Sequence, residues 1–140
     1  MKIEKLTAPQ KSIWSVEQYF KGSSVNNICG TATFNEEIEF EKLKQAIKHV
    51  YKKHDNFKLR FKIDEGEIVQ TISNNDNCEI KIIEVQSEEE FREKQEKIAR
   101  EPFKIEEEPL AKFYIFTFPN GKGAFVPIMH HLISDAWTIA

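Results

Sequence analysis

Cysteine is scarce in this chain, and so is any sign of export. Cys29 and Cys78 are the two cysteines among 140 residues, which is too few for a disulfide framework. The opening residues, MKIEKLTAPQ, contain no apolar run of the kind found in secretory signals. We therefore expect a protein of the reducing cytoplasm.

Long hydrophobic runs and an excess of positive charge are also missing. No stretch approaches the roughly 20 apolar residues that are needed to span a bilayer. Lys and Arg number 20 against 23 Asp and Glu, for a formal net charge of −3, whereas binding to a phosphate backbone requires a basic surface. The lysines of KLKQAIKHVYKKH fall off the apolar stripe of a predicted helix, as on a solvated face. We expect neither nucleic acid nor membrane as a partner.

The composition is that of a globular chain. Hydrophobic residues make up 40% of the sequence and charged residues 31%. A length of 140 residues is typical of one domain or of a piece of a larger one. No internal repeat, low-complexity tract or linker divides the chain, so we expect no domain boundary within it.

Three helices are predicted from apolar periodicity and capping signals. The first begins at TAPQ, where Thr7 and Gln10 can form a capping box, and it ends near Gly22. The second covers about residues 40–53, and the third opens at Ser87 and stops near residue 102. The expected buried positions of the first are Ile13, Trp14, Val16 and Phe20, and those of the second are Leu43, Ala46, Ile47, Val50 and Tyr51.

Alternating or wholly apolar runs predict the strands. One lies at about 27–34, and FKLRFKI would place Lys58, Arg60 and Lys62 together on one face. Further strands are EIVQTI, CEIKIIEV, AKFYIFTF and AFVPIMHH, the last two joined by a turn at PNGKG. The order is helix, strand, helix, three strands, helix and two strands. It predicts an α/β (α+β) sandwich with a mixed, largely antiparallel sheet flanked by helices.

The end of the last strand carries the candidate chemistry, in the sequence MHHLISDAW. Successive side chains of a strand point to opposite faces, so one of His130 and His131 would be buried and the other would meet a substrate. Asp135 lies four residues after His131, and AWTIA resembles the first turn of a helix that is cut short.

Three interpretations of this segment remain open. A neutral imidazole can act as a general base in acyl transfer. Alternatively, His131 and Asp135 could bind a metal, although a catalytic zinc needs a third protein ligand that no pattern here supplies. In the third interpretation Asp135 caps a helix or pairs with a cation and no chemistry occurs. No G-x-S-x-G elbow is present, so a base would act on a nucleophile of the substrate.

The segment resembles the last core motif of the condensation domains of nonribosomal peptide synthetases, MHHxxSDGW, with Ala136 in place of glycine. These domains share their fold with chloramphenicol acetyltransferase and other coenzyme A-dependent acyltransferases. The opening family motif, A-Q-x-x-x-W, resembles APQKSIW, with Gln10 and Trp14 in register. The second motif, R-H-x-x-L-R-T-x-F, resembles KHDNFKLRF, with lysine at position 58 where arginine is usual.

The resemblance implies that residues 1–140 are the amino-terminal lobe of a condensation domain, truncated just after the HHxxxD motif. In the family, two lobes form a tunnel in which a thioester donor and an amine acceptor meet, each on the phosphopantetheine arm of a carrier protein. No cofactor is bound directly. The missing carboxy-terminal lobe and the carrier domains are therefore the implied partners.

The resemblance also implies roles for individual residues. His131 would be the catalytic base or would orient the amine, and His130 would be structural. Asp135 would form an ion pair with a cation of the second motif, and Lys58 or Arg60 could supply it. Gln10 and Trp137 would support the site.

A non-catalytic, condensation-like interaction lobe is the competing hypothesis, and Ala136 and Lys58 favour it. Because half of the tunnel would be missing, we expect this fragment to need a partner lobe for catalysis, whereas the parent protein would be an acyltransferase. Because the surface facing that lobe would be uncovered, we also expect the isolated chain to self-associate, for example as a homo-oligomer.

Overall fold

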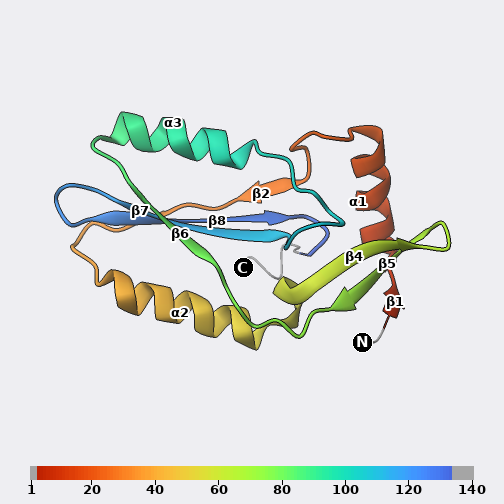
Figure 1. The fold of residues 1–140 in the computed structure, drawn as a ribbon. Helices are drawn as coiled ribbons and strands as arrows, with labels where there is room; N and C mark the ends of the chain where they lie inside the picture. Colours follow the sequence, from red (N-terminus) through yellow and green to blue (C-terminus); the bar gives the residue numbers. More distant parts are fainter. Residues whose placement is uncertain (1–2, 134–140) are drawn as a thin grey trace.

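The computed structural model describes residues 3–133, which form two β-sheets and three α-helices (Figure 1). In chain order the elements are β1 (Ile3–Lys5), α1 (Ala8–Tyr19), β2 (Asn27–Cys29), β3 (Ala32–Thr33), α2 (Phe40–Lys53), the 3-10 helix η1 (Asp55–Lys58), β4 (Leu59–Asp64), β5 (Glu67–Ile72), β6 (Ile80–Glu84), α3 (Glu88–Ala99), β7 (Ala111–Thr117) and β8 (Gly123–His130).

The larger sheet has the strand order β2-β8-β7-β6, and β3 also pairs with β8. β7 and β8 are antiparallel, as are β2 and β3 against β8, whereas β6 and β7 are parallel and are joined through α3. A parallel pair needs such a crossover because its two strands start at the same end of the sheet. The predicted mixed, largely antiparallel architecture is therefore confirmed.

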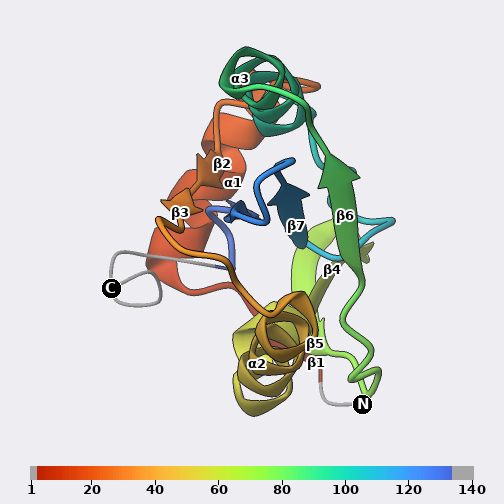
Figure 2. The ribbon, with the colours of Figure 1, turned by 90° about the vertical axis from the view of Figure 1, so that its left-hand side faces the viewer.

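Helices α2 and α3 cover opposite faces of this sheet, as the end-on view of Figure 2 shows. Side chains alternate along β7, so Phe113 contacts Tyr51 of α2 while Phe116 packs edge-on against Phe91 of α3. Phe116 is fully buried. The core therefore has two apolar layers, one on each side of β7 and β8.

β8 enters the sheet at Gly123, where there is no room for a side chain. A Cβ at this position would lie 2.6 Å from the carbonyl oxygen of Phe116 and 2.9 Å from the ring of Phe40. The glycine thus allows β8 to approach both β7 and the start of α2.

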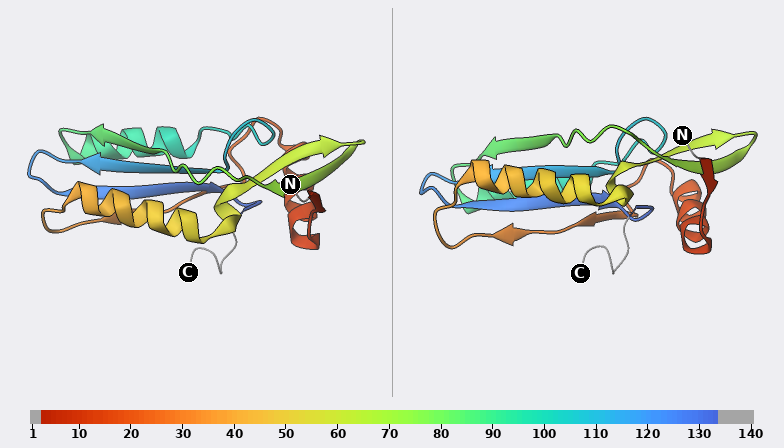
Figure 3. Two further views of the ribbon diagram at one scale, coloured as in Figure 1. Left: turned by 60° about the horizontal axis from the view of Figure 1, so that its bottom comes forward. Right: turned by 90° about the horizontal axis from the view of Figure 1, so that it is seen from below.

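The smaller sheet, β1-β5-β4, is antiparallel and lies beside α1 beyond the end of the larger sheet (Figure 3). Its hairpin turns at Glu65 and Gly66, whose φ angles are 50° and 79°. Two successive positive φ values are typical of the turns that fit the twist of a two-strand hairpin. The turn predicted at DEGE is therefore confirmed.

Several sequence-based boundaries are wrong. β1 was not predicted, because it has three residues and its sequence shows no strand pattern; its hydrogen bonds to β5 define it. The strand expected at 27–34 is divided into β2 and β3, both paired to β8. The third helix ends at Ala99, earlier than expected. Residues 57 and 58 belong to η1 rather than to β4.

The buried sides of two helices also differ from the prediction. Val16 of α1 and Phe20, which follows the helix, are exposed, and Glu17 is buried instead. In α2, Ile47 and Tyr51 are buried as expected, but Val50 is 47% exposed. Periodicity identifies the apolar stripe of a helix, but the neighbouring elements decide how much of that stripe is covered.

Within residues 3–133, every helix is too short and too polar to cross a membrane.

The start of α1 is fixed by the predicted capping box. The Thr7 hydroxyl accepts the Gln10 N–H at 3.3 Å, and the Gln10 side-chain oxygen accepts the Thr7 N–H at 2.9 Å. The cap also positions the rest of the Gln10 amide, which reaches into the molecule.

We predict that Thr7→Ala lowers the free energy of unfolding by about 1 kcal/mol, because the first turn of α1 loses its side-chain acceptor. Urea denaturation of the 140-residue chain measures this change. Thr7→Ser is the control and should stay close to the wild type, since it keeps the hydroxyl. An equal loss in both variants would contradict the assignment of the cap.

Candidate functional site

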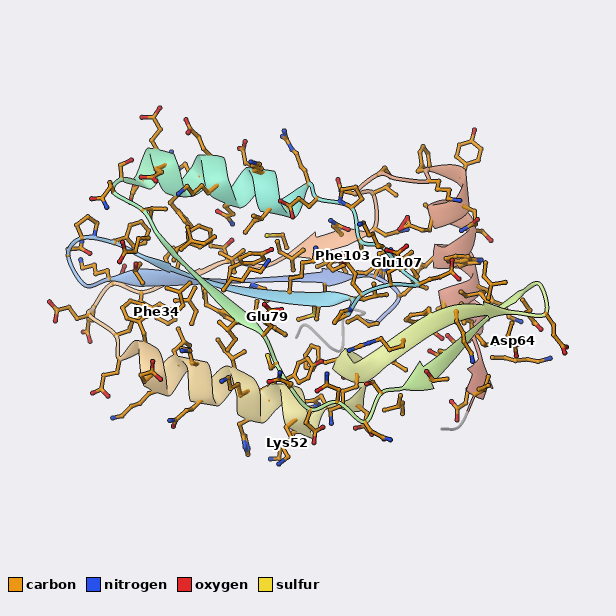
Figure 4. The ribbon with its side chains drawn as sticks, in the orientation of Figure 1. Phe34, Lys52, Asp64, Glu79, Phe103 and Glu107 are labelled. Carbon is orange, nitrogen blue, oxygen red and sulfur yellow. The ribbon has the colours of Figure 1, made fainter. Side chains whose placement is uncertain are left out.

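His130 ends β8 and is fully buried, with 0% of its surface exposed. It continues the inward-facing positions of the strand, after Ala124, Val126 and Ile128. The Phe103 ring, labelled in Figure 4, packs edge-on against the imidazole with 6.0 Å between ring centres. The alternation of inward-facing side chains along β8 therefore places the His130 imidazole in the core.

Both ring nitrogens of His130 are engaged. Nδ1 accepts the backbone N–H of Leu132 at 3.0 Å, and Nε2 lies 2.6 Å from a carboxylate oxygen of Glu17. A nitrogen that accepts a hydrogen bond carries no proton, so the proton of the neutral ring is on Nε2 and is donated to Glu17. This pattern defines one tautomer of His130.

Burial lowers the pKa of His130, and the hydrogen bond to Glu17 opposes this shift. The geometry acts in the same direction as burial, because a second proton on Nδ1 would break the bond from the Leu132 N–H. The folded protein therefore holds His130 as a neutral, fixed group.

His131 leaves the strand and begins a turn that runs through residue 133. Its N–H donates to the carbonyl of Asn26 at 2.9 Å, and the Ile133 N–H donates to the carbonyl of His130 at 3.1 Å. The residue is half-buried, in contrast to His130. Of the adjacent pair, one histidine is thus enclosed and the other is accessible at the surface, as predicted for a strand end.

Two side-chain amides bind the carbonyl groups of the same turn. Gln10 Nε2 donates to the Leu132 carbonyl at 3.0 Å, and Asn56 Nδ2 donates to the Ile133 carbonyl at 3.1 Å. These amides come from α1 and from η1. The turn after β8 is therefore held by groups from three separate segments, counting the segment of Asn26.

Lys58 does not lie where the sequence analysis placed it. The prediction that it shares a strand face with Arg60 is wrong, because Lys58 ends η1 while Arg60 belongs to β4. The backbone turns between the two residues, so the strand alternation does not extend back to Lys58.

The buried Lys58 ammonium lies 2.6 Å from Asp76 and 3.7 Å from Asp55, and it donates to the Lys52 carbonyl at 3.0 Å. Its hydrogen bond with Asp76 raises the pKa of Lys58 and lowers that of the Asp76 carboxyl. Lys52, labelled in Figure 4, is in the last turn of α2. Lys58 therefore fastens η1 to the end of α2.

Arg60 donates to the Leu59 carbonyl at 3.0 Å. The predicted partner of these cations, Asp135, lies outside the described residues 3–133, as do Ala136, Trp137 and the helix expected to follow them. The ion pair of Asp135 with Lys58 or Arg60 stays a prediction.

Trp14 of the opening motif is partly buried against the core.

The described part of the chain contains no group of three or more His, Cys, Asp or Glu residues placed to hold a metal ion.

Sequence reasoning missed Glu17, Asn26 and Asn56. One signal was available for Glu17, which lies three and four residues after Trp14 and Ile13 and so falls on the apolar stripe of α1. An acidic residue at such a position needs a buried partner. The two asparagines carry no comparable signal, because Asn is common in loops for local reasons.

We predict that Glu17→Gln lowers the pKa of His130 further, because the carboxylate favours the charged ring and the amide does not. Histidine signals in an NMR pH titration measure the midpoint, which should lie below about 6.5 in the wild type. Because the unfolded ring would then bind protons first, His130 makes the fold less stable as the pH falls below that value.

Glu17→Ala is the companion variant. It removes the Glu17 acceptor from the buried Nε2–H, at a cost of about 1–3 kcal/mol in the free energy of unfolding, whereas the glutamine variant can still accept that proton. A midpoint that rises in Glu17→Gln, or equal stability of the two variants, would contradict the assigned pair.

The sequence matches the family described as Condensation domain over residues 2–140. It is 28% identical over 134 residues to surfactin synthase subunit 1 of Bacillus subtilis (strain 168), covering 96% of this chain and 4% of that protein. It is 28% identical over 136 residues to bacitracin synthase 2 of Bacillus licheniformis, covering 96% of this chain and 5% of that protein. The chain thus spans a small part of these curated relatives.

Solved structures share the fold. The starter condensation domain of rhizomide synthetase RzmA superposes with a TM-score of 0.87 at 18% identity, covering 98% of this chain and 36% of that one. The condensation domain of the Monacolin K polyketide synthase MokA gives 0.84 at 16% identity, covering 93% and 30%. These likenesses confirm the predicted fold class, a lobe of the chloramphenicol acetyltransferase type. With the match over nearly its whole length, the chain belongs to the condensation-domain family.

Proposed function

We propose that the protein containing this chain forms amide bonds, by transfer of an acyl group from a carrier-bound thioester to an amine. The observation that carries the proposal is the placement of the two histidines in a chain of the condensation-domain family. His130 is enclosed and neutral, and His131 stands half-buried on a turn immediately beyond the sheet. We therefore assign the chemistry to the half-buried His131 and the supporting role to His130.

In this reaction the amine nitrogen attacks the thioester carbonyl carbon. A C–N bond forms, the C–S bond breaks, and the nitrogen loses a proton. We assign the transfer of that proton to His131, which would accept it from the amine and pass it to the departing thiolate. The imidazole then ends the cycle in its starting form, and no outside oxidant or cofactor is consumed.

Residues 1–140 would supply the amino-terminal lobe in this proposal. The carboxy-terminal lobe would close the tunnel, and carrier proteins would present donor and acceptor on phosphopantetheine arms. The relatives that match are synthetases far longer than this chain, which supports such an arrangement. Carrier-bound thioesters fit the cytoplasmic location predicted from the sequence.

A non-catalytic lobe is the second candidate, and Lys58 is the observation that favours it. The lysine replaces the usual arginine of the second motif, and its ammonium is engaged by Asp76 and by the end of α2. A cation committed in this way has less capacity to orient Asp135. The enzymatic assignment then depends on His131 itself.

We predict that His131→Ala lowers product formation by about 10²- to 10⁴-fold, the usual contribution of a general base. The assay uses the full-length protein that contains this chain, with one carrier loaded with an acyl thioester and the other with an amine. His49→Ala, on the exposed side of α2, is the matched control and should react at the wild-type rate. Equal yields from both variants would favour the non-catalytic lobe.

The isolated chain is predicted to self-associate. Its described surface exposes large apolar side chains, among them Tyr19 at 83% and Val25 at 51%, and uncovered apolar area favours association. Sedimentation velocity over a range of concentrations should show a mass that increases with concentration. A monomer at all concentrations would contradict this prediction.

A further inference from the structure

The turn that carries His131 is held at almost every backbone group. The N–H groups of His131, Leu132 and Ile133 donate to the Asn26 carbonyl, to His130 Nδ1 and to the His130 carbonyl, respectively. The carbonyl groups of Leu132 and Ile133 accept from the amides of Gln10 and Asn56. A three-residue turn with five such bonds has little freedom to reorient.

The two amide donors are themselves rigidly placed. Gln10 exchanges two hydrogen bonds with the buried Gln70, at 2.9 and 3.0 Å, in addition to its role in the cap of α1. Asn56 lies in η1, beside Phe57, whose ring stacks on Tyr51 with 5.7 Å between centres. Each amide therefore links the turn to a packed element, which is α1 for Gln10 and η1 for Asn56.

Lys58 extends the support at Asn56. Its bonds to Asp76 and to the Lys52 carbonyl fix the end of η1 two residues after Asn56. The chain of contacts runs from α2 through Lys58 and η1 to Asn56, and from there to the Ile133 carbonyl. This route to the histidine turn is made entirely of described residues and does not involve Asp135.

We propose that Asn56, together with Gln10, is a positioning residue for His131. The two amides hold the Leu132 and Ile133 carbonyls, and so they set the direction in which the His131 imidazole leaves the turn. Asn56 acts through His131 and touches no reacting atom. The effect on turnover rests on the proposed function, whereas the effect on the ring of His131 does not.

The test variant is Asn56→Asp, which keeps the shape of the side chain but replaces the donor by a carboxylate oxygen that repels the Ile133 carbonyl. In the full-length protein with loaded carriers, kcat should fall by about 10- to 100-fold, because misplacement by about 1 Å has effects of this size. The KM for each carrier should change by less than about 2-fold, since a residue that acts by positioning the reacting group affects kcat rather than the binding of substrate.

Asn27→Asp is the matched control. The Asn27 amide also binds two backbone carbonyls, those of Ala99, the last residue of α3, at 3.1 Å and of Glu101 at 2.8 Å. The same atomic exchange there removes side-chain hydrogen bonds to these two carbonyls and leaves the backbone pairing of Asn27 with His130 in place. If Asn27→Asp lowers kcat as much as Asn56→Asp, the effect is one of stability and the proposal is overturned.

A double variant tests whether Asn56 acts through His131. In the His131→Ala background, Asn56→Asp should produce no further loss of turnover, because the group that it positions is gone. Two losses that multiply would show an independent role for Asn56 and would overturn the proposal.

A structural measurement separates this proposal from the proposed function. In the 140-residue chain with labelled histidines, the NMR signals of the His131 ring should shift clearly more in Asn56→Asp than in Asn27→Asp. Unchanged His131 signals in Asn56→Asp would overturn the positioning role even if His131 is the base. Wild-type turnover of His131→Ala would instead defeat the proposed function, while shifted signals would still support the positioning role.

Discussion

The buried hydrogen bonds of His130 are the constraint on which this site depends. One imidazole joins Glu17 of α1 to the end of β8 through Nε2, and it accepts the Leu132 N–H through Nδ1. A single side chain thereby ties a helix, a strand and the following turn together. Removing polar atoms from water at this depth is costly unless they are paired, so the packed core favours this arrangement over others.

Under the proposed function, that constraint would give the two adjacent histidines different tasks. The first is held as a neutral ring inside the protein, where its tautomer is set by an acceptor on one side and a donor on the other. The backbone of His131 is fixed where it begins, because it directly follows the anchored His130. Rigid support behind a reacting group reduces the entropy that must be lost on reaching the reactive geometry.

Lys58 shows that a motif residue can make contacts that its motif does not indicate. The family resemblance implies an ion pair of Lys58 or Arg60 with Asp135, which lies outside the described residues. Within these residues, Lys58 ends η1 and bonds to Asp76 and the Lys52 carbonyl. Lysine presents a compact ammonium rather than the planar fork of arginine, and three oxygen atoms surround it here. Support for the histidine turn then passes through η1 and Asn56.

Features that depend on near neighbours along the chain could be predicted from the amino-acid sequence. The capping box at Thr7, the helix at residues 40–53, the hairpin at Gly66 and the burial of one histidine out of two all follow from spacing along the chain. Such features are set by backbone geometry and by the alternation of side chains. The family motif likewise sits in consecutive residues and could be recognised without coordinates.

The contacts between groups far apart in the sequence could not be predicted in this way. Glu17 is 113 residues from His130, and Asn56 is 77 residues from Ile133. No local pattern specifies such pairs, because they result from how α1 and η1 pack at the end of the larger sheet. The same packing left Val16 exposed and buried Glu17 instead. Periodicity predicts which face of a helix is apolar, but the fold as a whole determines which element covers that face.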